Sequence, residues 1–141
     1  MWADFRAGTG VDAPYDSFGF GGDDTPELRN ELAWLVRDGP KRATAGLLDD
    51  YEADGDPIPA VGDYFVVTDA AGDAVTIIRT TWLDIVRFVD VDEQFAWDEG
   101  EGDRTLGWWR EAHARFFAAS GHAVNDDTKV VLERFDKVWP L

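Results

Sequence analysis

The feature that most constrains the fold is a long run of β-branched and aromatic residues at 74–88, AVTIIRTTWLDIVRF. Such side chains suit the pleated, half-buried surface of a β-sheet, so the run predicts either one long bent strand or two strands. Two further strands are predicted at 64–68 and at 129–139, and the turn DAAGD joins the first of them to the long run. These segments together predict a β-sheet in the second half of the chain.

The first of two clear amphipathic helices is predicted to begin just after Thr25. Thr25 suits the N-cap position, and Pro26 suits the first helical position. Apolar side chains then recur at helical spacing at Leu28, Leu32, Leu35 and Val36. The dipeptide Gly39-Pro40 ends this helix, because proline cannot continue it.

The second amphipathic helix is predicted to follow Thr105, which acts as its N-cap, and to end at Gly121. Its inward face is expected to carry Leu106, Trp109, His113, Phe116 and Phe117. Adjacent helical side chains diverge by about 100°, so at most one of Trp108 and Trp109 can face a pocket. We expect Trp109 to pack in the core.

Shorter elements are predicted between these segments. A short helix is expected near 46–53 and another at 92–99, with Gly100 as the C-cap of the latter. Residues 41–45 are predicted to form a loop or short strand, in which a bulge could bring Lys41 and Thr44 to one side. Residues 1–24 are expected to form an irregular arm that is pinned by aromatic side chains.

Strands and helices that do not alternate as regular βαβ units indicate an α+β fold. The expected architecture is a single domain over residues 1–141, with a mainly antiparallel sheet or small barrel. A chain of this length is long enough to bury a core but short for two domains.

The charge of the chain limits its partners. Asp and Glu number 29 against 13 Lys and Arg, which gives a formal net charge of −16. This charge opposes extended non-specific binding to nucleic acid, which depends on cations that neutralise phosphates. The N-terminal segment lacks a continuous apolar run, so we expect neither a signal peptide nor a membrane partner, and a cytoplasmic location.

No metal or cofactor is expected. The chain has no cysteine and no His-x-x-x-His pair. Two acidic runs, DYEADGDPIPAV from Asp50 and DVDEQFAWDEGE from Asp90, partly match the calcium-binding loop pattern. Neither completes it, because the first has Val61 where a bidentate Glu is needed and the second has Phe95 where glycine is needed. His113 is interpreted as a core histidine that is satisfied by one partner, because its helical neighbours are apolar.

Three segments in order carry a family resemblance: LVRDGPKRATAGLL, PIPAVGDYFVVTDAAGDAVTIIRTT and VDVDEQFAWDEGEGDRTLGWWREAHARFF. The chain resembles the ASCH superfamily from about Phe18 to Phe135, in particular its longer bacterial branch of predicted RNA-binding proteins. The resemblance implies a PUA-like, mainly antiparallel β-barrel with flanking helices and a cleft beside the barrel. The family's Gly-x-Lys-x-x-Thr element at this cleft is matched by Gly39, Lys41 and Thr44.

The resemblance also implies a site. Related small ASCH enzymes that deacetylate 4-acetylcytidine use a Lys, a Thr and a Glu, and this Glu lies in an Ala-x-x-Glu segment ahead of a Thr-Leu helix start. Here Ala96 and Glu99 precede Thr105 and Leu106, which names Lys41, Thr44 and Glu99 as the catalytic residues. An extra EGDR segment leaves Glu101 as the alternative carboxylate. We expect Lys41 and Glu99 to meet at the mouth of one cleft, with Thr44 beside them.

The leading functional hypothesis is hydrolysis of a modified nucleoside, and the alternative is an RNA-binding module or ribonuclease. A third and weaker class is a protein-interaction domain. Thr44 would attack the amide carbonyl, which needs a base. A lysine is a base only after losing its proton, which burial favours and a nearby carboxylate opposes. If Lys41 stays charged, the site becomes a clamp for a nucleotide.

Four further side chains are predicted to contact the substrate: Arg42, Arg104, Trp108 and Arg110. The arginines would bind phosphate or base edges, and the indole ring would stack on a base. The competing interpretation of the arginines is that they pair with the abundant surface carboxylates.

Overall fold

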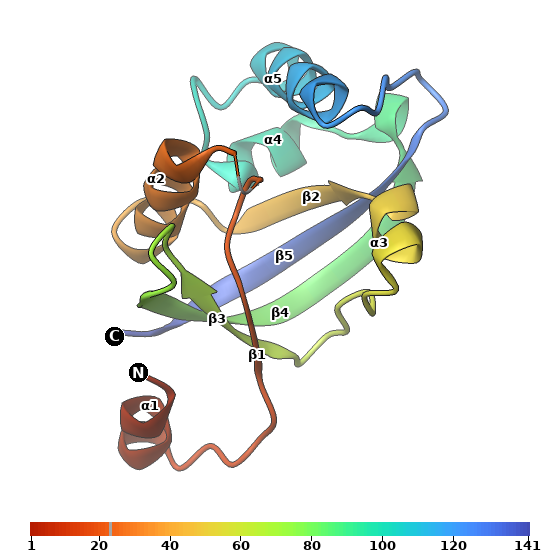
Figure 1. Ribbon diagram of the computed structural model, residues 1–141. Coiled ribbons are helices and arrows are strands. Elements are labelled where there is room, and N and C mark those ends of the chain that lie inside the picture. Colours follow the sequence, from red (N-terminus) through yellow and green to blue (C-terminus); the bar gives the residue numbers. More distant parts are fainter. Residues whose placement is uncertain (23) are drawn as a thin grey trace.

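The computed structural model describes residues 1–22 and 24–141 and contains one curled sheet with helices around it (Figure 1). The strands lie in the order β1-β3-β4-β5-β2. Their bounds are Asp16–Phe18 (β1), Ala43–Leu47 (β2), Tyr64–Thr68 (β3), Ala74–Arg87 (β4) and Lys129–Trp139 (β5). The helices are Trp2–Thr9 (α1), Pro26–Arg37 (α2), Leu48–Asp54 (α3), Glu93–Glu99 (α4) and Leu106–Ala119 (α5), with a 3-10 turn at Phe88–Asp90.

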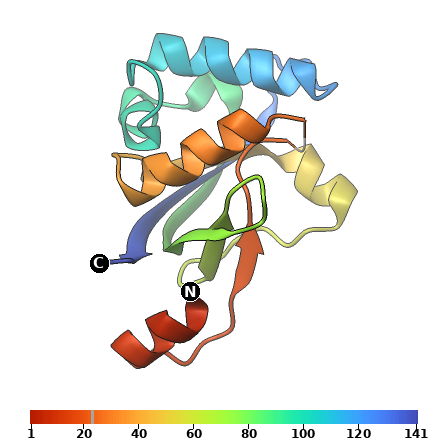
Figure 2. The same ribbon diagram turned by 60° about the vertical axis from the view of Figure 1, so that its left-hand side comes forward.

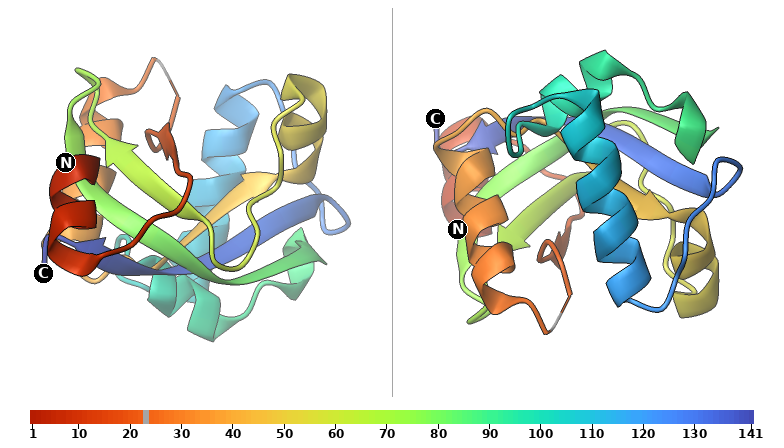
Figure 3. Two further views of the ribbon diagram at one scale, coloured as in Figure 1. Left: turned by 90° about the horizontal axis from the view of Figure 1, so that it is seen from below. Right: turned by 90° about the horizontal axis from the view of Figure 1, so that it is seen from above.

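The sheet is mainly antiparallel and does not close. β3, β4, β5 and β2 pair antiparallel in that order, and β1 adds to β3 in parallel. The β4–β5 register shifts at Ile77/Ile78 and at Thr80/Trp82, and such irregularities bend the strands. The result is a half-barrel with β1 and β2 at its edges, seen from below in the left view of Figure 3. The predicted α+β class is therefore confirmed, with an open half-barrel as the barrel-like part.

Two faces of the sheet serve different cores because successive side chains of a strand point to opposite sides. On β5, Val130 and Leu132 join the core under α4 and α5, which contains Trp109 and Phe117. Phe135 instead joins the core under α2. Because the sheet is curled, α2 and α5 still lie beside each other, in the upper part of Figure 2. Glu133 lies between these apolar residues of β5 and is also buried.

The N-terminal segment is more regular than predicted. The expected irregular arm at 1–24 contains α1 and β1, and only residue 23 of that range lies outside the described residues. Phe5 of α1 packs on Val66 and Ile77 of the sheet. The prediction failed because α1 is short and only weakly amphipathic, and because β1 depends on its pairing with β3.

The bounds of the other predicted elements lie within a few residues of those in the structure. Of the two predicted N-caps, one makes the capping hydrogen bond and the other does not. Thr105 caps α5 as expected, because its hydroxyl accepts a hydrogen bond from the Trp108 amide. Thr25 precedes α2 but makes no capping bond; its hydroxyl exchanges hydrogen bonds with the backbone of Gly22. Among the helices that the structure describes, none has the length and apolar character needed to cross a membrane.

Gly100 holds the end of α4 against the segment that carries Lys41. Its φ of 68° lies in the left-handed region, which favours glycine. A Cβ atom at this position would lie 2.9 Å from the Lys41 nitrogen and 2.9 Å from the Pro40 carbonyl carbon. Both contacts are to backbone, which a side-chain rotation cannot relieve.

We therefore expect Gly100→Ala to lower the free energy of unfolding by more than about 2 kcal/mol, since it combines backbone strain with a steric clash. Gly107→Ala is the matched control, because Gly107 is an exposed glycine of α5 with open space around its Cβ position. That change should be neutral or raise stability by up to about 1 kcal/mol. Urea denaturation of the two variants measures both effects, and equal effects would contradict the close packing at Gly100.

Candidate functional site

Lys41 lies at the junction between α2 and β2, where the backbone is tied to two helices. The Lys41 amide donates to the Leu35 carbonyl of α2 at 3.3 Å, and the Arg42 amide donates to the Asp98 carbonyl of α4 at 2.7 Å. These bonds direct the Lys41 side chain towards the end of α4. The residue is only 1% exposed.

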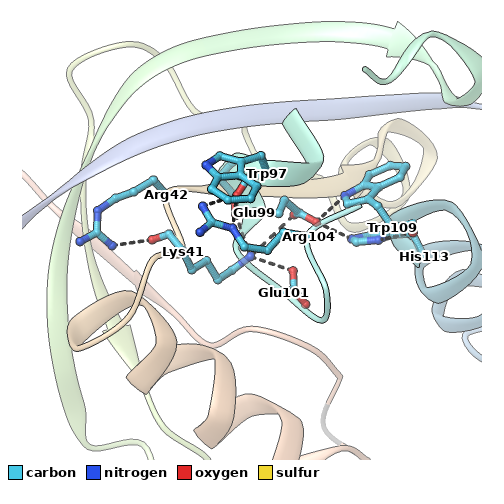
Figure 4. A network of polar contacts seen from close by, with 9 residues as sticks. Lys41, Arg42, Trp97, Glu99, Glu101, Arg104, Trp109 and His113 are labelled. Atoms are coloured by element: carbon cyan, nitrogen blue, oxygen red, sulfur yellow. Dashed lines mark hydrogen bonds and ion pairs between the residues drawn. The ribbon is translucent and has the colours of Figure 1, made fainter. Parts of the chain in front are cut away.

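The Lys41 amine is surrounded by oxygen atoms (Figure 4). Nζ donates to the Ala43 carbonyl at 2.7 Å and to Glu101 Oε2 at 3.0 Å, and Glu99 Oε1 lies 3.7 Å away. An ammonium group has three N–H donors and no acceptor. Three acceptors around Nζ therefore match the charged form of the side chain.

Glu99 is the centre of the cluster and is also 1% exposed. Its Oε2 accepts hydrogen bonds from the indole nitrogen of Trp109 and from His113 Nε2, the latter at 2.9 Å. Burial raises the pKa of Glu99, but the charges of Lys41 and His113 and these hydrogen bonds outweigh it. The pKa falls to about 2, so the carboxylate is ionised.

His113 has two partners, not the one expected from its apolar surroundings. Nδ1 lies 2.9 Å from the Trp109 carbonyl oxygen, and Nε2 lies 2.9 Å from the Glu99 carboxylate. Both partners are hydrogen-bond acceptors, so the two contacts favour the doubly protonated, positively charged form of the ring. Burial lowers the pKa of His113, but the Glu99 charge and hydrogen bond outweigh it and leave the pKa raised.

Glu101 is the most accessible carboxylate of the cluster, with a side chain that is 15% exposed. Burial raises its pKa, the Lys41 charge opposes this, and the neighbouring Glu99 charge raises it further, so the net direction is upward. Sequence analysis left Glu99 and Glu101 as alternatives for the carboxylate beside Lys41, and the structure places both of them there. Glu99 is the fixed anion, and Glu101 holds a proton more readily.

The same cluster offers three ligand atoms to a metal ion. Atoms of Glu99, Glu101 and His113 lie within 4.8 Å of one another. The Lys41 ammonium and the positively charged His113 ring together balance the two carboxylates, and both nitrogens of His113 are engaged in hydrogen bonds. The group thus fits an internal ion-pair network better than a metal centre.

Thr44 faces a cavity of about 610 Å³ that lies beside β2. In the sheet Thr44 pairs with Glu133 of β5, so the two side chains share one face. The aromatic residues that line this cavity are Tyr15, Phe18, Phe20, Tyr51, Tyr64, Phe65, Phe116 and Phe117. Its acidic lining residues are Asp16, Asp50, Asp54, Asp56, Asp63 and Glu133.

Glu133 is the buried acid of the cavity and is 4% exposed. Thr80 Oγ1 donates to its Oε2 at 2.6 Å. Burial raises the pKa of Glu133, and this hydrogen bond opposes the shift only in part. Nearby, burial and the charges of Glu133 and Asp56 raise the pKa of Tyr51 to about 12.

The cluster and the cavity both lie beside the aromatic ring of Phe20. Phe20 lines the cavity, and its ring centroid lies 5.3 Å from Lys41 Nζ. The predicted approach of Lys41 to Glu99 is confirmed, but both are buried behind the lining and do not sit at its mouth. Among the described residues, no hydrogen bond joins Thr44 to either of them, because Thr44 points to the Glu133 face of the sheet.

Comparison with known proteins gives the family. The ASCH domain model matches residues 17–139, nearly the whole chain. The chain belongs to the ASCH family. ASCH domains are in general RNA-binding.

Two solved structures are similar over most of their length. The ASCH domain from Lactobacillus crispatus JV V101 is 31% identical, with a TM-score of 0.81, over 97% of this chain and 91% of that one. A protein from Enterococcus faecalis V583 is 32% identical, also with a TM-score of 0.81, over 96% of this chain and 84% of that one. No curated protein sequence matches the chain.

The predicted substrate-contacting residues of this ASCH domain lie outside the cavity lining in the described part of the chain. The Arg42 guanidinium donates to the carbonyls of Val36, Gly39 and Lys41 at the end of α2. Arg104 lies over the Trp97 ring at 3.6 Å and donates to its carbonyl.

The other two predicted contacts also have partners within the chain. Arg110 donates to the Val89 carbonyl at 3.1 Å, and Trp108 covers Gly102. A Cβ atom at Gly102 would meet the indole ring. The predicted roles of all four residues in substrate binding stay predictions.

The sequence reasoning missed Glu133 and Tyr51 as site residues. Glu133 occurs within an otherwise apolar stretch, VVLERF, and an isolated acid at an inward position of a strand is a signal that could have been used. Tyr51 carries no such signal. Its ring lies against Gly46, where a Cβ atom would approach Tyr51 Cε2 to 3.2 Å.

The raised pKa of His113 predicts a pH-dependent stability. The imidazolium–Glu99 contact contributes stability that is fully present below the unfolded pKa of about 6.5 and is lost as pH rises through the folded pKa. The difference in unfolding free energy between wild type and His113→Gln should therefore be larger at pH 6 than at pH 9. Urea denaturation at both pH values measures it.

His122→Gln is the control for this experiment, because His122 pairs with Asp50 at the surface, with both side chains 44% exposed. Removing the His122 side chain should leave the pH dependence of the unfolding free energy nearly the same as in wild type. A His113→Gln difference that stays constant from pH 6 to 9 would show that His113 is not the titrating group.

Proposed function

We propose that this ASCH domain binds a nucleoside, or one unstacked nucleotide of a short RNA, in the cavity beside β2. The single observation that carries the proposal is the cavity itself. Its volume of about 610 Å³ lies within the roughly 300–1,000 Å³ of small-molecule sites. Aromatic rings along its walls provide surfaces on which a base can stack.

The charge of the lining favours a nucleoside over a longer RNA. The charged residues that line the cavity in the described chain are all acidic. Phosphate groups bind to proteins through Lys, Arg, backbone amides and helix N-termini, and carboxylates repel them. With a net charge of −16 on the chain, an extended RNA would have to be held against this field.

Binding of cytidine and of a short single-stranded RNA over a series of salt concentrations tests the proposal. We expect cytidine affinity to change little with salt, because no phosphate is neutralised. An RNA held through its phosphates would instead show a log–log slope of about −0.7 per phosphate contacted. Isothermal titration calorimetry measures both ligands under identical conditions.

The matched variants Ser17→Trp and Ser120→Trp test whether cytidine binds in the cavity. Ser17 is an exposed residue of the cavity lining, whereas Ser120 is exposed at the end of α5 and outside the lining. The first change should weaken cytidine binding by at least about tenfold because the new ring occupies the cavity, and the second should not. Equal affinity of the two variants, or no binding of either ligand to wild type, would overturn the proposal.

Hydrolysis of an acylated nucleoside is the second candidate function. It is favoured by the position of Thr44, whose hydroxyl is the nucleophile of the implied Lys-Thr-Glu set and which lines the cavity. Thr44 would attack the amide carbonyl, the cytosine amine would leave with a proton, and water would release the acyl group from Thr44. The Lys41 ammonium must first lose a proton, and the acceptor closest at hand is Glu101, whose pKa is raised.

Turnover of 4-acetylcytidine by wild type, Lys41→Ala, Thr44→Ala and Glu99→Gln tests this second function. If the residues act as one unit, each change should remove most activity, and the losses should not add in combination. A general base contributes roughly 10²- to 10⁴-fold, so a loss below about tenfold at Lys41 would indicate a positioning role. The melting temperature of each variant is the control, because Lys41 and Glu99 are buried. Absence of wild-type turnover excludes the hydrolysis and leaves the binding function.

A further inference from the structure

One carboxylate oxygen of Glu133 is open to the cavity. Oε2 accepts a hydrogen bond from Thr80, and no described residue donates to the other oxygen. No fully buried side-chain nitrogen or oxygen of the described residues lacks a partner. The other oxygen of Glu133 must therefore reach open space, and the open space that Glu133 lines is the cavity.

The positive charges of the chain do not neutralise this acid. No described cation lies within ion-pair distance, 4.0 Å, of Glu133. Lys41 lowers its pKa from a distance, but the Lys41 amine is held by Glu99, Glu101 and the Ala43 carbonyl. Burial without a cation disfavours the ionised form of Glu133 and raises its pKa, and a ligand that brings a cation to the cavity stabilises that ionised form.

The rim of the cavity extends the negative field outward. Asp16, Asp54, Asp56 and Asp63 are exposed members of its lining. Among the described residues no Lys or Arg lines the cavity, so its charged lining residues have one sign. Clefts lined by one sign of charge concentrate ligands of the opposite sign.

The walls supply the second element of cation recognition. The faces of aromatic rings carry negative potential and attract cations within about 6 Å of the ring centroid. Two of the lining rings already contact cations of the chain: Lys41 Nζ lies 5.3 Å from the Phe20 centroid, and the Arg79 guanidinium lies 5.8 Å from that of Tyr64. Aromatic rings together with a carboxylate that has one open oxygen form a site for a flat cation that also carries an N–H donor.

We propose that the cavity selects a cationic nucleoside, whose positively charged base stacks on the aromatic walls and donates an N–H to Glu133. This inference rests on the proposed function and specifies its substrate class. A neutral base would stack in the same way but would leave the Glu133 charge uncompensated. A 5′-phosphate would bring a negative charge to the acidic rim.

Paired ligands of nearly equal size test the preference. At pH 7, 3-methylcytidine carries a positive charge on its base and cytidine is neutral. We expect 3-methylcytidine to bind about tenfold tighter or more, as a charge-assisted hydrogen bond and a cation–π contact together allow. Its 5′-monophosphate should bind more weakly than the nucleoside. Choline, a cation without a base, separates the contribution of the charge alone.

Two isosteric variants assign the preference to Glu133. Glu133→Gln keeps the size of the side chain and removes its charge, so 3-methylcytidine and cytidine should bind with affinities within about threefold of each other. Asp136→Asn is the matched control, because Asp136 is an exposed residue of the same strand and lies outside the cavity lining. That variant should retain the full preference. Circular dichroism and melting temperature check that both variants are folded.

The outcomes separate this inference from the proposed function. Equal binding of 3-methylcytidine and cytidine to wild type, or a preference that survives Glu133→Gln, overturns the cationic preference while the nucleoside site stands. Binding of choline without binding of any nucleoside overturns the nucleoside as ligand, and with it the proposed function. Tighter binding of the monophosphate than of the nucleoside would contradict the repulsive rim.

Discussion

The buried ammonium of Lys41 is the interaction on which the arrangement of this domain depends. It joins the junction of α2 and β2 to the end of α4 and the loop that follows, through Glu99 and Glu101. Glu99 then connects to Trp109 and His113 on α5. Removing one member of a buried ion pair leaves an uncompensated charge, which typically costs about 3–5 kcal/mol. The network thus holds three helices and an edge strand in one relative position.

This network also explains why the cations of the site do not line the cavity. The cations of Lys41 and His113 are used internally, each by carboxylates that belong to the same network. The neighbouring cavity therefore keeps only acidic groups among its charged lining residues in the described chain. Phe20 stands between the two regions and touches both. The aromatic rings, Thr44 and Glu133 line the cavity, whereas Lys41, Glu99 and Glu101 are outside its lining.

Family membership and local geometry contribute different information about function. The ASCH family is in general RNA-binding, and the similarity to solved ASCH structures covers nearly the whole chain. The field in this particular cavity is set by Glu133 and its acidic rim, which are features of this sequence. Asp50 and Asp54 lie in α3, and Asp56 and Asp63 lie in the connector between α3 and β3, so the charges at these positions can differ without changing the half-barrel.

The sequence by itself determined the local elements and, within the ion network, the pairing of Lys41 with Glu99. Periodicity and capping residues placed α2 and α5, and β-branched runs placed β3, β4 and β5. The pairing of Lys41 with Glu99 was predictable because a family motif links residues that are distant in the chain. Only the tertiary structure decided that β1 adds to β3, that His113 has two partners, and that Thr44 shares a face with Glu133. Each of these depends on which strand or helix lies beside which, and strand pairing over long sequence separations leaves no periodic signal in either partner alone.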